Sequence, residues 1–410
     1  MKILAVHNRY QHPGGEDSVF ETECAMLSAA GHTVARFEVS NDAIPAGWGK
    51  CLFFFKTIWN RRSARAVREA IRRGKPDVAH FHNTFPLISP AAYHACAAEG
   101  VPVVQTLHNF RYCCLNAYLL RDAKVCELCL GKNPWRGVVR KCYRDSYAQS
   151  FAVWAMLTTH RALGTYSRKV DAYIALTEFG KRKFVEAGLP EEKIYVKGNA
   201  VAGSAGRLTA PVFTSGYREA SRRTLLTRHP PDQVVLYVGR LSPEKGPDVL
   251  VEAWKNSNLN ARLVIIGDGP ERAALEKQAA GLSGVTFAGT LTAPQVADWM
   301  RRATVLVIPS VCYETFSLTL NEAAAAGLPV VASDLGAFAA CVKDGETGFL
   351  FPPGDAAALA RVLSDPSKLR AVGENARRAF LAGESVPEKN VARLLEIYKK
   401  AKDIKNKKDT

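Results

Sequence analysis

Short apolar runs alternate with longer amphipathic stretches along nearly the whole chain, and this alternation predicts strands that alternate with helices. Ten apolar runs have the length and composition of buried strands: residues 2–6, 33–39, 78–82, 101–108, 172–177, 234–239, 261–267, 285–289, 304–310 and 329–333. Helical patterns lie between some of them, at residues 18–30, 246–255, 270–280 and 318–326. The pattern predicts an α/β protein with parallel sheets covered by helices on both faces.

The number of predicted strands and the 410-residue length both favour two domains. The alternation pauses at residues 203–232, where Gly, Ser, Thr, Arg and Pro dominate. We therefore expect one doubly wound domain at residues 1–202 and a second at 203–384, with residues 385–410 forming a helix that packs back on the first. Ligands bind at the carboxyl ends of strands in such sheets. We expect the two sheets to face each other across a cleft.

Composition and charge narrow the class of protein. The chain is 47% apolar and 23% charged, which is ordinary for a globular protein, and its net charge of +16 favours an anionic partner. That partner could be nucleic acid, a phosphorylated substrate or an acidic membrane face. No run of 18 uncharged apolar residues predicts a membrane-spanning helix. The start, MKILAVHNRY, is too polar after Val6 for a signal peptide, so we expect a cytoplasmic protein.

A glycine pair follows the first predicted strand, in HPGGEDSVFE at residues 12–21. Gly14 and Gly15 allow a sharp turn and a close approach to a ligand. Ser18 and Glu21 have the spacing of a capping box, which predicts a helix that begins at Ser18. A glycine turn that leads into a helix N-terminus can bind an anion. The alternative is a tight turn without a ligand.

Two acidic residues complete this turn. Glu16 and Asp17 are poorly suited to phosphate, but their carboxylates can accept hydrogen bonds from the hydroxyls of a sugar or another acceptor.

A pair of cations follows the strand that ends at Gly239, in YVGRLSPEKG at residues 237–246. Arg240 and Lys245 lie five residues apart around a turn. Two cations at the carboxyl end of a strand can neutralise a diphosphate leaving group. The alternative is a pair of solvated surface cations.

Two glutamates lie eight residues apart in ETFSLTLNEAAAAGLPVVAS, residues 314–333. Glu314 follows a predicted strand, and Glu322 lies within the next helix, beside small alanines. A buried glutamate needs a polar partner, and the two hydroxyls of a ribose would serve. Gly267, in the sequence Gly-Asp-Gly, marks another turn from strand to helix.

Together, these motifs and the sequence TLHN at 106–109 resemble the retaining, GT-B-fold, nucleotide-sugar glycosyltransferases of family four. The resemblance covers nearly the whole chain. It implies two Rossmann-like domains, an N-terminal one for the acceptor and a C-terminal one for a UDP- or GDP-sugar. It also implies transfer with retention of configuration. No Glu-x-x-His or Asp-x-Asp metal motif is present, so we expect catalysis without a metal.

The resemblance also implies site residues. Arg240 and Lys245 match the residues that hold the donor diphosphate, Glu314 the one that contacts the donor sugar, and His108 one that lies near the transferred sugar. The implied catalytic set is His108, Arg240, Lys245 and Glu314. The implied donor-binding set is Gly15, Gly239, Gly267, Thr290, Leu291, Phe316, Ser317, Leu318 and Glu322. The implied acceptor-binding set is Gly14, Glu16 and Asp17.

One departure from the family pattern concerns the donor sugar. The family usually has E-G-F-G or a close variant, whereas this chain has Glu-Thr-Phe-Ser at 314–317. Replacing both glycines predicts a tighter pocket, so the identity of the donor sugar stays open.

Five of the ten cysteines crowd into thirty residues: Cys113, Cys114, Cys126, Cys129 and Cys142. Without a secretory signal they do not suggest a disulfide framework. The spacing C-x11-C-x2-C-x12-C, counted from Cys114, suits a four-thiolate zinc site in a looped insert at about 110–145. The alternative is a set of buried free thiols.

The segment Leu52–Lys75 joins an apolar aromatic run to a basic helix. Arg61, Arg65, Arg68 and Arg72 share one helical face. This combination suits an anionic membrane interface, and the alternative is a solvated helix on the outside of the domain.

We therefore expect a retaining glycosyltransferase that acts on a lipid-linked or cell-surface polysaccharide acceptor, such as lipopolysaccharide, at the inner face of the cytoplasmic membrane of a bacterium. Nucleic acid is not expected as a partner. A GT-B nucleotide-sugar epimerase and a zinc-containing nucleic-acid-binding protein are the alternatives.

Overall fold

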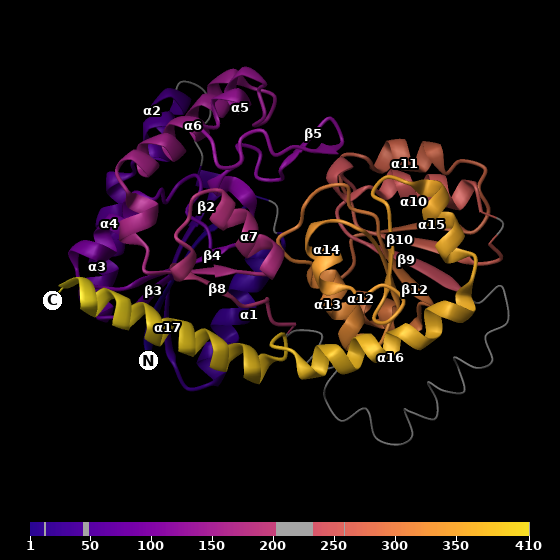
Figure 1. Cartoon of the computed structure of the whole chain (residues 1–410). Helices are drawn as coiled ribbons and strands as arrows, with labels where there is room; N and C mark the ends of the chain where they lie inside the picture. Colours follow the sequence, from indigo (N-terminus) through magenta and orange to yellow (C-terminus); the bar gives the residue numbers. More distant parts are fainter. Residues whose placement is uncertain (12–13, 44–48, 202–232, 258, 410) are drawn as a thin grey trace. The chain divides into compact units, whose positions relative to one another are not determined.

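The computed structural model describes residues 1–11, 14–43, 49–201, 233–257 and 259–409 (Figure 1). The segment 203–232, where the sequence predicts a domain boundary, lies outside the described residues. The chain divides into two compact units. Unit 1 comprises residues 1–121, 126–200 and 387–410, and unit 2 comprises residues 122–125 and 201–386.

Unit 1 is built on a six-stranded parallel sheet with the order β2-β1-β3-β4-β7-β8. Its strands are β1 (Lys2–Arg9), β2 (Thr33–Ser40), β3 (Val78–Phe81), β4 (Val103–Leu107), β7 (Ala172–Ala175) and β8 (Ile194–Val196). Its helices are α1 (Gly15–Ala29), α2 (Gly49–Ile58), α3 (Arg61–Gly74), α4 (Ala91–Ala98), α5 (Trp135–Val139), α6 (Tyr147–Ala162), α7 (Glu178–Glu186) and α17 (Pro387–Asp409). Short strands β5 (Leu120–Arg121) and β6 (Lys124–Val125) lie in the cysteine-rich segment.

Unit 2 has a second six-stranded parallel sheet, with the order β11-β10-β9-β12-β13-β14. Its strands are β9 (Val234–Val238), β10 (Arg262–Ile266), β11 (Val285–Gly289), β12 (Val305–Ile308), β13 (Val330–Ser333) and β14 (Phe349–Phe351). Its helices are α10 (Pro247–Lys255), α11 (Arg272–Gln278), α12 (Ala293–Arg302), α13 (Leu318–Ala326), α14 (Gly336–Cys341), α15 (Ala356–Leu363) and α16 (Pro366–Ala382).

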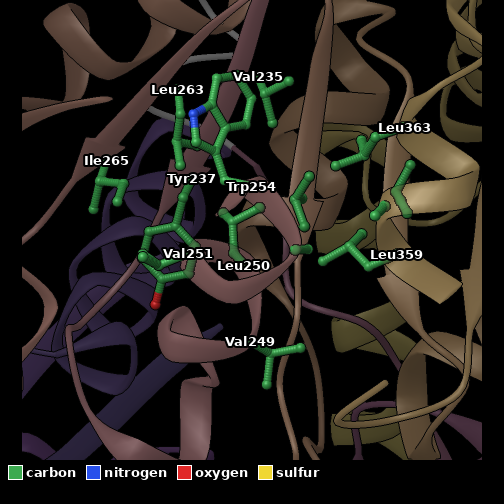
Figure 2. Close-up of a cluster of buried hydrophobic side chains, with 14 of the residues drawn as sticks. Val235, Tyr237, Val249, Leu250, Val251, Trp254, Leu263, Ile265, Leu359 and Leu363 are labelled. Atoms are coloured by element: carbon green, nitrogen blue, oxygen red, sulfur yellow. The ribbon is translucent and has the colours of Figure 1, made fainter. Parts of the chain in front are cut away.

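The strands of unit 2 are apolar on both faces because helices cover both faces. Val235 and Tyr237 of β9 pack with Trp254 of α10 and Leu359 of α15 on one face (Figure 2). The intervening Leu236 packs into a separate cluster on the other face, with Met300 of α12 and Phe338 of α14. This alternation explains why the predicted strands read as continuous apolar runs.

The last helix of the chain belongs to unit 1. Helix α17 contacts α1, β4 and β7 and runs along this unit in Figure 1. Ion pairs help to hold it there: Lys402 lies 2.9 Å from Asp77, and Lys408 lies 2.7 Å from Asp171. Tyr398 of this helix is fully buried. Within the described ranges, no helix is both long enough and apolar enough to span a membrane.

The ten predicted strands are all present in the structure, but the predicted start of the first helix is wrong. Helix α1 begins at Gly15, three residues before Ser18. The reason is that Asp17 caps the turn: its Oδ2 accepts a hydrogen bond of 2.9 Å from the backbone N–H of Gly14. Glu21 binds Arg9 and Arg36 instead of closing a capping box with Ser18.

Candidate active site

The strand order of each sheet marks where a ligand is expected to bind. In unit 2 the order reverses between β9 and β12, which is the arrangement of a Rossmann sheet. In unit 1 the corresponding change of direction lies between β1 and β3. Ligands of open α/β sheets bind beyond the carboxyl ends of the strands at such a switch point. The segments after these four strands therefore form the candidate sites.

In unit 2, the segments after β9 and β12 meet through an ion pair. Lys245 Nζ lies 2.8 Å from Glu314 Oε1, and Ser310 Oγ donates a hydrogen bond of 2.7 Å to the same oxygen. Burial acts to lower the pKa of Lys245, but the charge and hydrogen bond of Glu314, together with Cys312 and Glu244, outweigh burial and raise it. The structure thus brings together two residues that the sequence placed 69 positions apart.

A glycine makes this close approach possible. Lys245 ends a 3₁₀ turn, Pro243–Lys245, and Gly246 follows with φ of 62°. A Cβ at Gly246 would lie 2.1 Å from the carbonyl oxygen of Pro309, after β12. Only glycine allows the backbone segments that carry Lys245 and Glu314 to approach this closely.

Arg240 differs from Lys245 in its surroundings. Its side chain is exposed and has no hydrogen-bond or ion-pair partner among the described residues. Its backbone oxygen accepts a hydrogen bond of 2.9 Å from the hydroxyl of Tyr237, which fixes the backbone after β9. Gly239, beside it, packs against the same tyrosine ring, and a Cβ there would lie 3.1 Å from the hydroxyl. Arg240 therefore offers a positive charge that no carboxylate of the described chain neutralises.

Helix α13 begins beside this ion pair. Ser317 is its N-cap, with its side chain accepting a hydrogen bond of 3.1 Å from the N–H of Leu320. Phe316 and Leu318, on either side of the cap, are half-buried. The helix N-terminus presents N–H groups and a partial positive charge, both suited to an anion.

Glu322 lies one turn further along α13 and is half-buried. Burial raises the pKa of its carboxyl group. Among the described residues it has no hydrogen-bond or ion-pair partner, in contrast to Glu314. A partly buried carboxylate without a protein partner is suited to hydroxyl donors from a ligand.

The remaining donor-binding residues follow β10 and β11. Gly267 follows β10 with φ of 136°, and a Cβ there would lie 1.9 Å from the carbonyl oxygen of Gly239. Thr290 is exposed after β11. Leu291 lines a surface pocket of about 470 Å³ together with Trp299 and other residues of α12. The turns after β9 and β10 thus touch, and those after β11 lie at the same edge of the sheet.

In unit 1, the loop after β1 is held by Asp17, which is buried. Its Oδ1 lies 3.0 Å from His7 Nε2 and accepts a weak hydrogen bond from the N–H of Tyr10, and its Oδ2 accepts from Gly14. Both oxygens are therefore engaged within unit 1. Gly15 is exposed at the first turn of α1.

Glu16 links this loop to the segment after β4. Its Oε1 accepts a hydrogen bond of 2.5 Å from Asn109 Nδ2, and it also hydrogen-bonds to Tyr10. Burial raises the pKa of Glu16 against the opposing effect of these two partners. Asn109 directly follows His108 in the chain. The hydrogen bond between Glu16 and Asn109 therefore joins the loop after β1 to the segment that carries His108.

His108 is half-buried and contacts a cluster of buried histidines. Its Nε2 lies 3.0 Å from Nδ1 of His82, which follows β3. On its other side, His82 Nε2 lies 3.2 Å from Glu23 Oε1 of α1. Lys197, after β8, lies 3.1 Å from the second oxygen of Glu23. Burial lowers the pKa of His108 well below its usual value and that of His82 to about 4.

The residues around His108 that the sequence reasoning missed are Glu23, His82, Asn109, Lys197 and Asn390. Asn109 lies in the TLHN motif, which contained a signal for it. Lys197 had a weaker signal, because it directly follows the short apolar run Ile194–Val196. Its burial, with 1% exposed, appears only in the structure. Nothing local marks Asn390, which lies about 190 residues beyond Lys197 in the sequence.

The cysteine-rich segment does not form a compact ligand group in the structure. Burial raises the pKa of Cys129, as does its proximity to Cys114, Cys142 and Cys126, so the four thiols are neighbours. Among the described residues, however, only Glu23, His80 and His82 bring three potential ligand atoms within 4.8 Å of one another. The nine cysteines whose side chains are described are free.

The basic face of α3 is partly engaged within unit 1. Arg68 and Arg72 both pair with Glu99, at the end of α4, whereas Arg61 and Arg65 are exposed. Side chains of residues 51–53, at the start of the predicted membrane segment, lie outside the described set.

An aromatic patch draws on three helices, of which α2 directly precedes this basic helix in the sequence. Phe54 stacks on Phe151, which in turn contacts Trp135 and Trp154, and Phe55 is 66% exposed. We refer to these five residues, from α2, α5 and α6, as the aromatic patch.

Comparisons with known proteins match both units. Residues 13–202 match the family described as Glycosyltransferase Family 4, and residues 232–365 match Glycosyl transferases group 1. A D-inositol 3-phosphate glycosyltransferase from Thermobispora bispora is 32% identical over 80% of this chain and 71% of its own length. The chain belongs to glycosyltransferase family 4.

Other relatives match over shorter stretches. D-inositol 3-phosphate glycosyltransferases from Streptomyces scabiei and Kribbella flavida are 41% and 37% identical, but the matches span only 34% and 43% of their lengths. Among solved structures, HepE from Anabaena in complex with UDP has a TM-score of 0.65 at 20% identity, covering 97% of this chain and all of that one. Sucrose-phosphate synthase from Thermosynechococcus elongatus has a TM-score of 0.69 at 21% identity, covering 97% and 98%. The fold is that of the GT-B glycosyltransferases.

Proposed function

We propose that this member of family 4 is a retaining glycosyltransferase that transfers a sugar from a nucleoside-diphosphate sugar, a UDP- or GDP-sugar, to a lipid-linked or cell-surface saccharide acceptor. The observation that carries the proposal is the pairing of Lys245 with Glu314 at the switch point of unit 2, close in sequence to Arg240, whose side chain has no partner within the described ranges. Family membership and the UDP bound to HepE, a protein of the same fold, support the donor class.

Unit 2 would bind the donor. Arg240 and Lys245 would neutralise the charge that develops on the diphosphate as the bond to the sugar breaks. Glu314, whose position is fixed by Lys245 and Ser310, would contact the sugar. Glu322 would accept hydrogen bonds from the ribose hydroxyls, and Gly239, Gly267, Phe316, Ser317 and Leu318 would contact the diphosphate and sugar through their backbones. Thr290 and Leu291 would lie near the base.

Unit 1 would bind the acceptor, with Gly14 and Glu16 near its hydroxyls and Asp17 holding their loop. His108 and the backbone of Gly15 would lie near the transferred sugar. The anomeric carbon becomes oxocarbenium-like as the leaving diphosphate departs. In the proposed reaction the diphosphate accepts the proton of the acceptor hydroxyl, and the new glycosidic bond forms on the same face. We propose that no metal takes part in this step.

The location of the enzyme follows from its acceptor. A lipid-linked acceptor requires docking at the bilayer, and the aromatic patch together with Arg61 and Arg65 supplies the apolar and basic groups that such docking needs. We propose peripheral binding to the inner face of the cytoplasmic membrane.

We also propose that Cys114, Cys126, Cys129 and Cys142 hold a structural zinc ion. Their spacing and mutual proximity support this, although the thiols would have to move closer together to coordinate one ion. Elemental analysis of protein purified without a chelator should give about one zinc per chain. Cys126→Ser should lose the metal, and Cys341→Ser, in unit 2, should retain it. Zinc-free wild-type protein would contradict the proposal.

A second candidate function, nucleotide-sugar epimerisation, would use the same donor site without an acceptor. Binding to nucleic acid would instead use the basic charge alone. A thermal-shift screen of nucleotide sugars tests the donor, because a ligand at 100 times its dissociation constant stabilises the protein by about 2.7 kcal/mol. Acceptor-dependent release of nucleoside diphosphate then separates transfer from epimerisation. No shift with any nucleotide sugar, together with a gel shift of nucleic acid at physiological salt, would contradict the proposed function.

A further inference from the structure

The buried cluster around His108 contains a continuous series of contacts that begins at a carboxylate. Glu23 of α1 lies at its centre, with Oε2 3.1 Å from Lys197 Nζ and Oε1 3.0 Å from His80 Nδ1 and 3.2 Å from His82 Nε2. The side chains of all four residues are 5% exposed or less. His82 then meets His108 at 3.0 Å.

The contact between the two histidines is made through their nitrogens. Their ring planes differ by 21°, and their centroids are 5.2 Å apart. Since the nitrogens are only 3.0 Å apart, the rings meet edge to edge and a hydrogen bond joins His82 Nδ1 to His108 Nε2.

From these contacts we infer that Glu23 and His82 are positioning residues that hold His108 in one neutral tautomer, with its hydrogen on Nε2 and none on Nδ1. The place of His108 beside the transferred sugar rests on the proposed function.

The direction of the hydrogen bonds follows from Glu23. Burial acts to raise its pKa, but Lys197, His80 and His82 together hold the pKa well below its usual value, so Glu23 is a carboxylate. A carboxylate only accepts hydrogen bonds. His82 Nε2 lies 3.2 Å from Glu23 Oε1, and this oxygen has no partner with hydrogen-bond geometry among the described residues, so an N–H at His82 Nε2 is favoured there over a lone pair.

The next two steps follow from the chemistry of a neutral imidazole, which has one N–H and one acceptor nitrogen. His82 is neutral, because burial lowers its pKa to about 4, so its Nδ1 is an acceptor. His108 must then donate from Nε2. Burial and the neighbouring His82 also hold the pKa of His108 well below its usual value, so its Nδ1 carries no hydrogen.

The opposite tautomers would leave a buried clash of acceptors. If His108 accepted at Nε2, His82 would carry its hydrogen on Nδ1, and its unprotonated Nε2 would face the Glu23 carboxylate at 3.2 Å. Two buried acceptors that face each other without a hydrogen between them are unfavourable. The observed contacts therefore select one arrangement.

A metal ion is the other way to satisfy this cluster, because Glu23, His80 and His82 have ligand atoms within 4.8 Å of one another. The ammonium group of Lys197 already supplies a positive charge to Glu23. His80 also has polar partners at both nitrogens, with Tyr398 Oη and Thr106 Oγ1 each at 2.8 Å. These contacts favour the hydrogen-bonded arrangement over a metal centre.

Long-range ¹H–¹⁵N correlation spectra of the full-length protein with ¹⁵N-labelled histidine test the inference directly. The signals of His108, assigned by their loss in His108→Gln, should show a protonated Nε2 and an unprotonated Nδ1 at pH 7. The reverse pattern, or a doubly protonated ring, would overturn the inference. A spectrum unchanged by adding and then removing a chelator excludes the metal; loss of the pattern with the chelator would also overturn it.

A variant pair tests the role of Glu23. Glu23→Gln replaces an obligate acceptor by an amide that can also donate, so His108 should show the reversed tautomer or a mixture of both. Glu21→Gln, on the same helix but paired at the surface with Arg9 and Arg36, is the matched control and should keep the wild-type pattern. An unchanged pattern in folded Glu23→Gln would overturn the positioning role. If Glu23→Gln does not fold, His82→Gln serves instead: loss of the obligate acceptor at Nδ1 should release His108 into a mixture.

The spectra and the activity separate the two proposals. If no nucleotide sugar is turned over but His108 shows the expected tautomer, the proposed function fails and the positioning inference stands. If the enzyme turns over donor while His108 carries its hydrogen on Nδ1, the positioning inference fails and the proposed function stands.

Discussion

The two units share one architecture but satisfy the polar groups at their switch points in different ways. In unit 2, Lys245 and Glu314 form a single ion pair, while Arg240 and Glu322 have no partner among the described residues. In unit 1, Glu23, His80, His82, His108 and Lys197 contact one another in a buried network.

This difference has a physical consequence. Groups without protein partners can exchange water for a charged ligand, whereas a closed network holds its members in fixed orientations and protonation states. Unit 2 is thus suited to binding a charged group, and unit 1 to orienting a neutral one. The following predictions test that contrast, beginning with the largest expected effect.

Replacing Lys245 or Arg240 by Ala should lower turnover of the nucleotide sugar by about 10²–10³-fold, because each meets charge that grows as the bond breaks. Binding of the nucleoside monophosphate should fall much less. Steady-state kinetics and calorimetric titration measure the two effects. Lys255→Ala, an exposed lysine of α10, is the control. Equal losses in turnover and monophosphate affinity would contradict the assigned role.

Acid should unfold unit 1 before unit 2. His82 and His160 of unit 1 have pKa values lowered to about 4 by burial, while an unfolded histidine has a pKa near 6.5. Above pH 6.5 both states are neutral. As the pH falls from about 6.5 to 4, only the unfolded chain takes up these protons, so stability is lost, by roughly 3 kcal/mol at most for each histidine.

Hydrogen exchange read by mass spectrometry, with the label pulsed at one fixed pH after incubation at different pH values, measures this effect in each unit. Peptides of β1, β3 and β4 should lose protection at a higher pH than those of β9 and β12. His160→Gln should flatten part of the pH dependence. Simultaneous loss of protection in both units would contradict the contrast.

Glu322→Ala should weaken binding of the donor nucleotide by about 1.5–3 kcal/mol, the value of a hydrogen bond that involves a charged group. The fold should be unaffected, because Glu322 has no protein partner among the described residues. Titration with UDP and with GDP measures the change, and Glu374→Ala, an exposed glutamate of the same unit, is the control. Unchanged affinity for both nucleotides would exclude the ribose contact.

Arg61→Glu and Arg65→Glu together should weaken binding to anionic vesicles, because each basic residue near such a surface contributes about 1 kcal/mol. The effect should shrink at high salt and leave hydrolysis of the donor by water unchanged. Cosedimentation with vesicles that contain phosphatidylglycerol measures it. Arg73→Glu, on another face of α3, is the control. Equal sedimentation of the wild type, the double variant and the control would show that Arg61 and Arg65 are solvated and do not bind the membrane.

The strands were well predicted because a parallel strand that is buried on both faces has a continuous run of apolar residues in the sequence. All ten predicted strands exist, and the missed β8 and β14 have only three residues each. Helix α13 has the predicted bounds, Leu318–Ala326. The predicted start of α1 was wrong because Ser18 and Asp17 can both cap a helix in this stretch. The choice of Asp17 depends on its contacts with His7 and Tyr10.

The candidate site was predictable where it depends on local motifs, and less so where it depends on distant contacts. Arg240, Lys245, Glu314 and Glu322 follow from short patterns after strands. The network around His108 does not, because Glu23, Lys197 and Asn390 come from three distant parts of the chain. Only the folded sheet and the returning helix bring them together.

The return of helix α17 also sets an order of events during synthesis. Asn390 accepts a hydrogen bond of 2.9 Å from Lys197, and Tyr398 lies 2.8 Å from His80, so the interior of unit 1 is completed by residues translated after those of unit 2. Unit 1 is therefore the first unit to emerge from the ribosome and the last to be complete. Until α17 arrives, the nascent chain carries Lys197 and His80 without these partners, although residues 233–386 of unit 2 have already been translated.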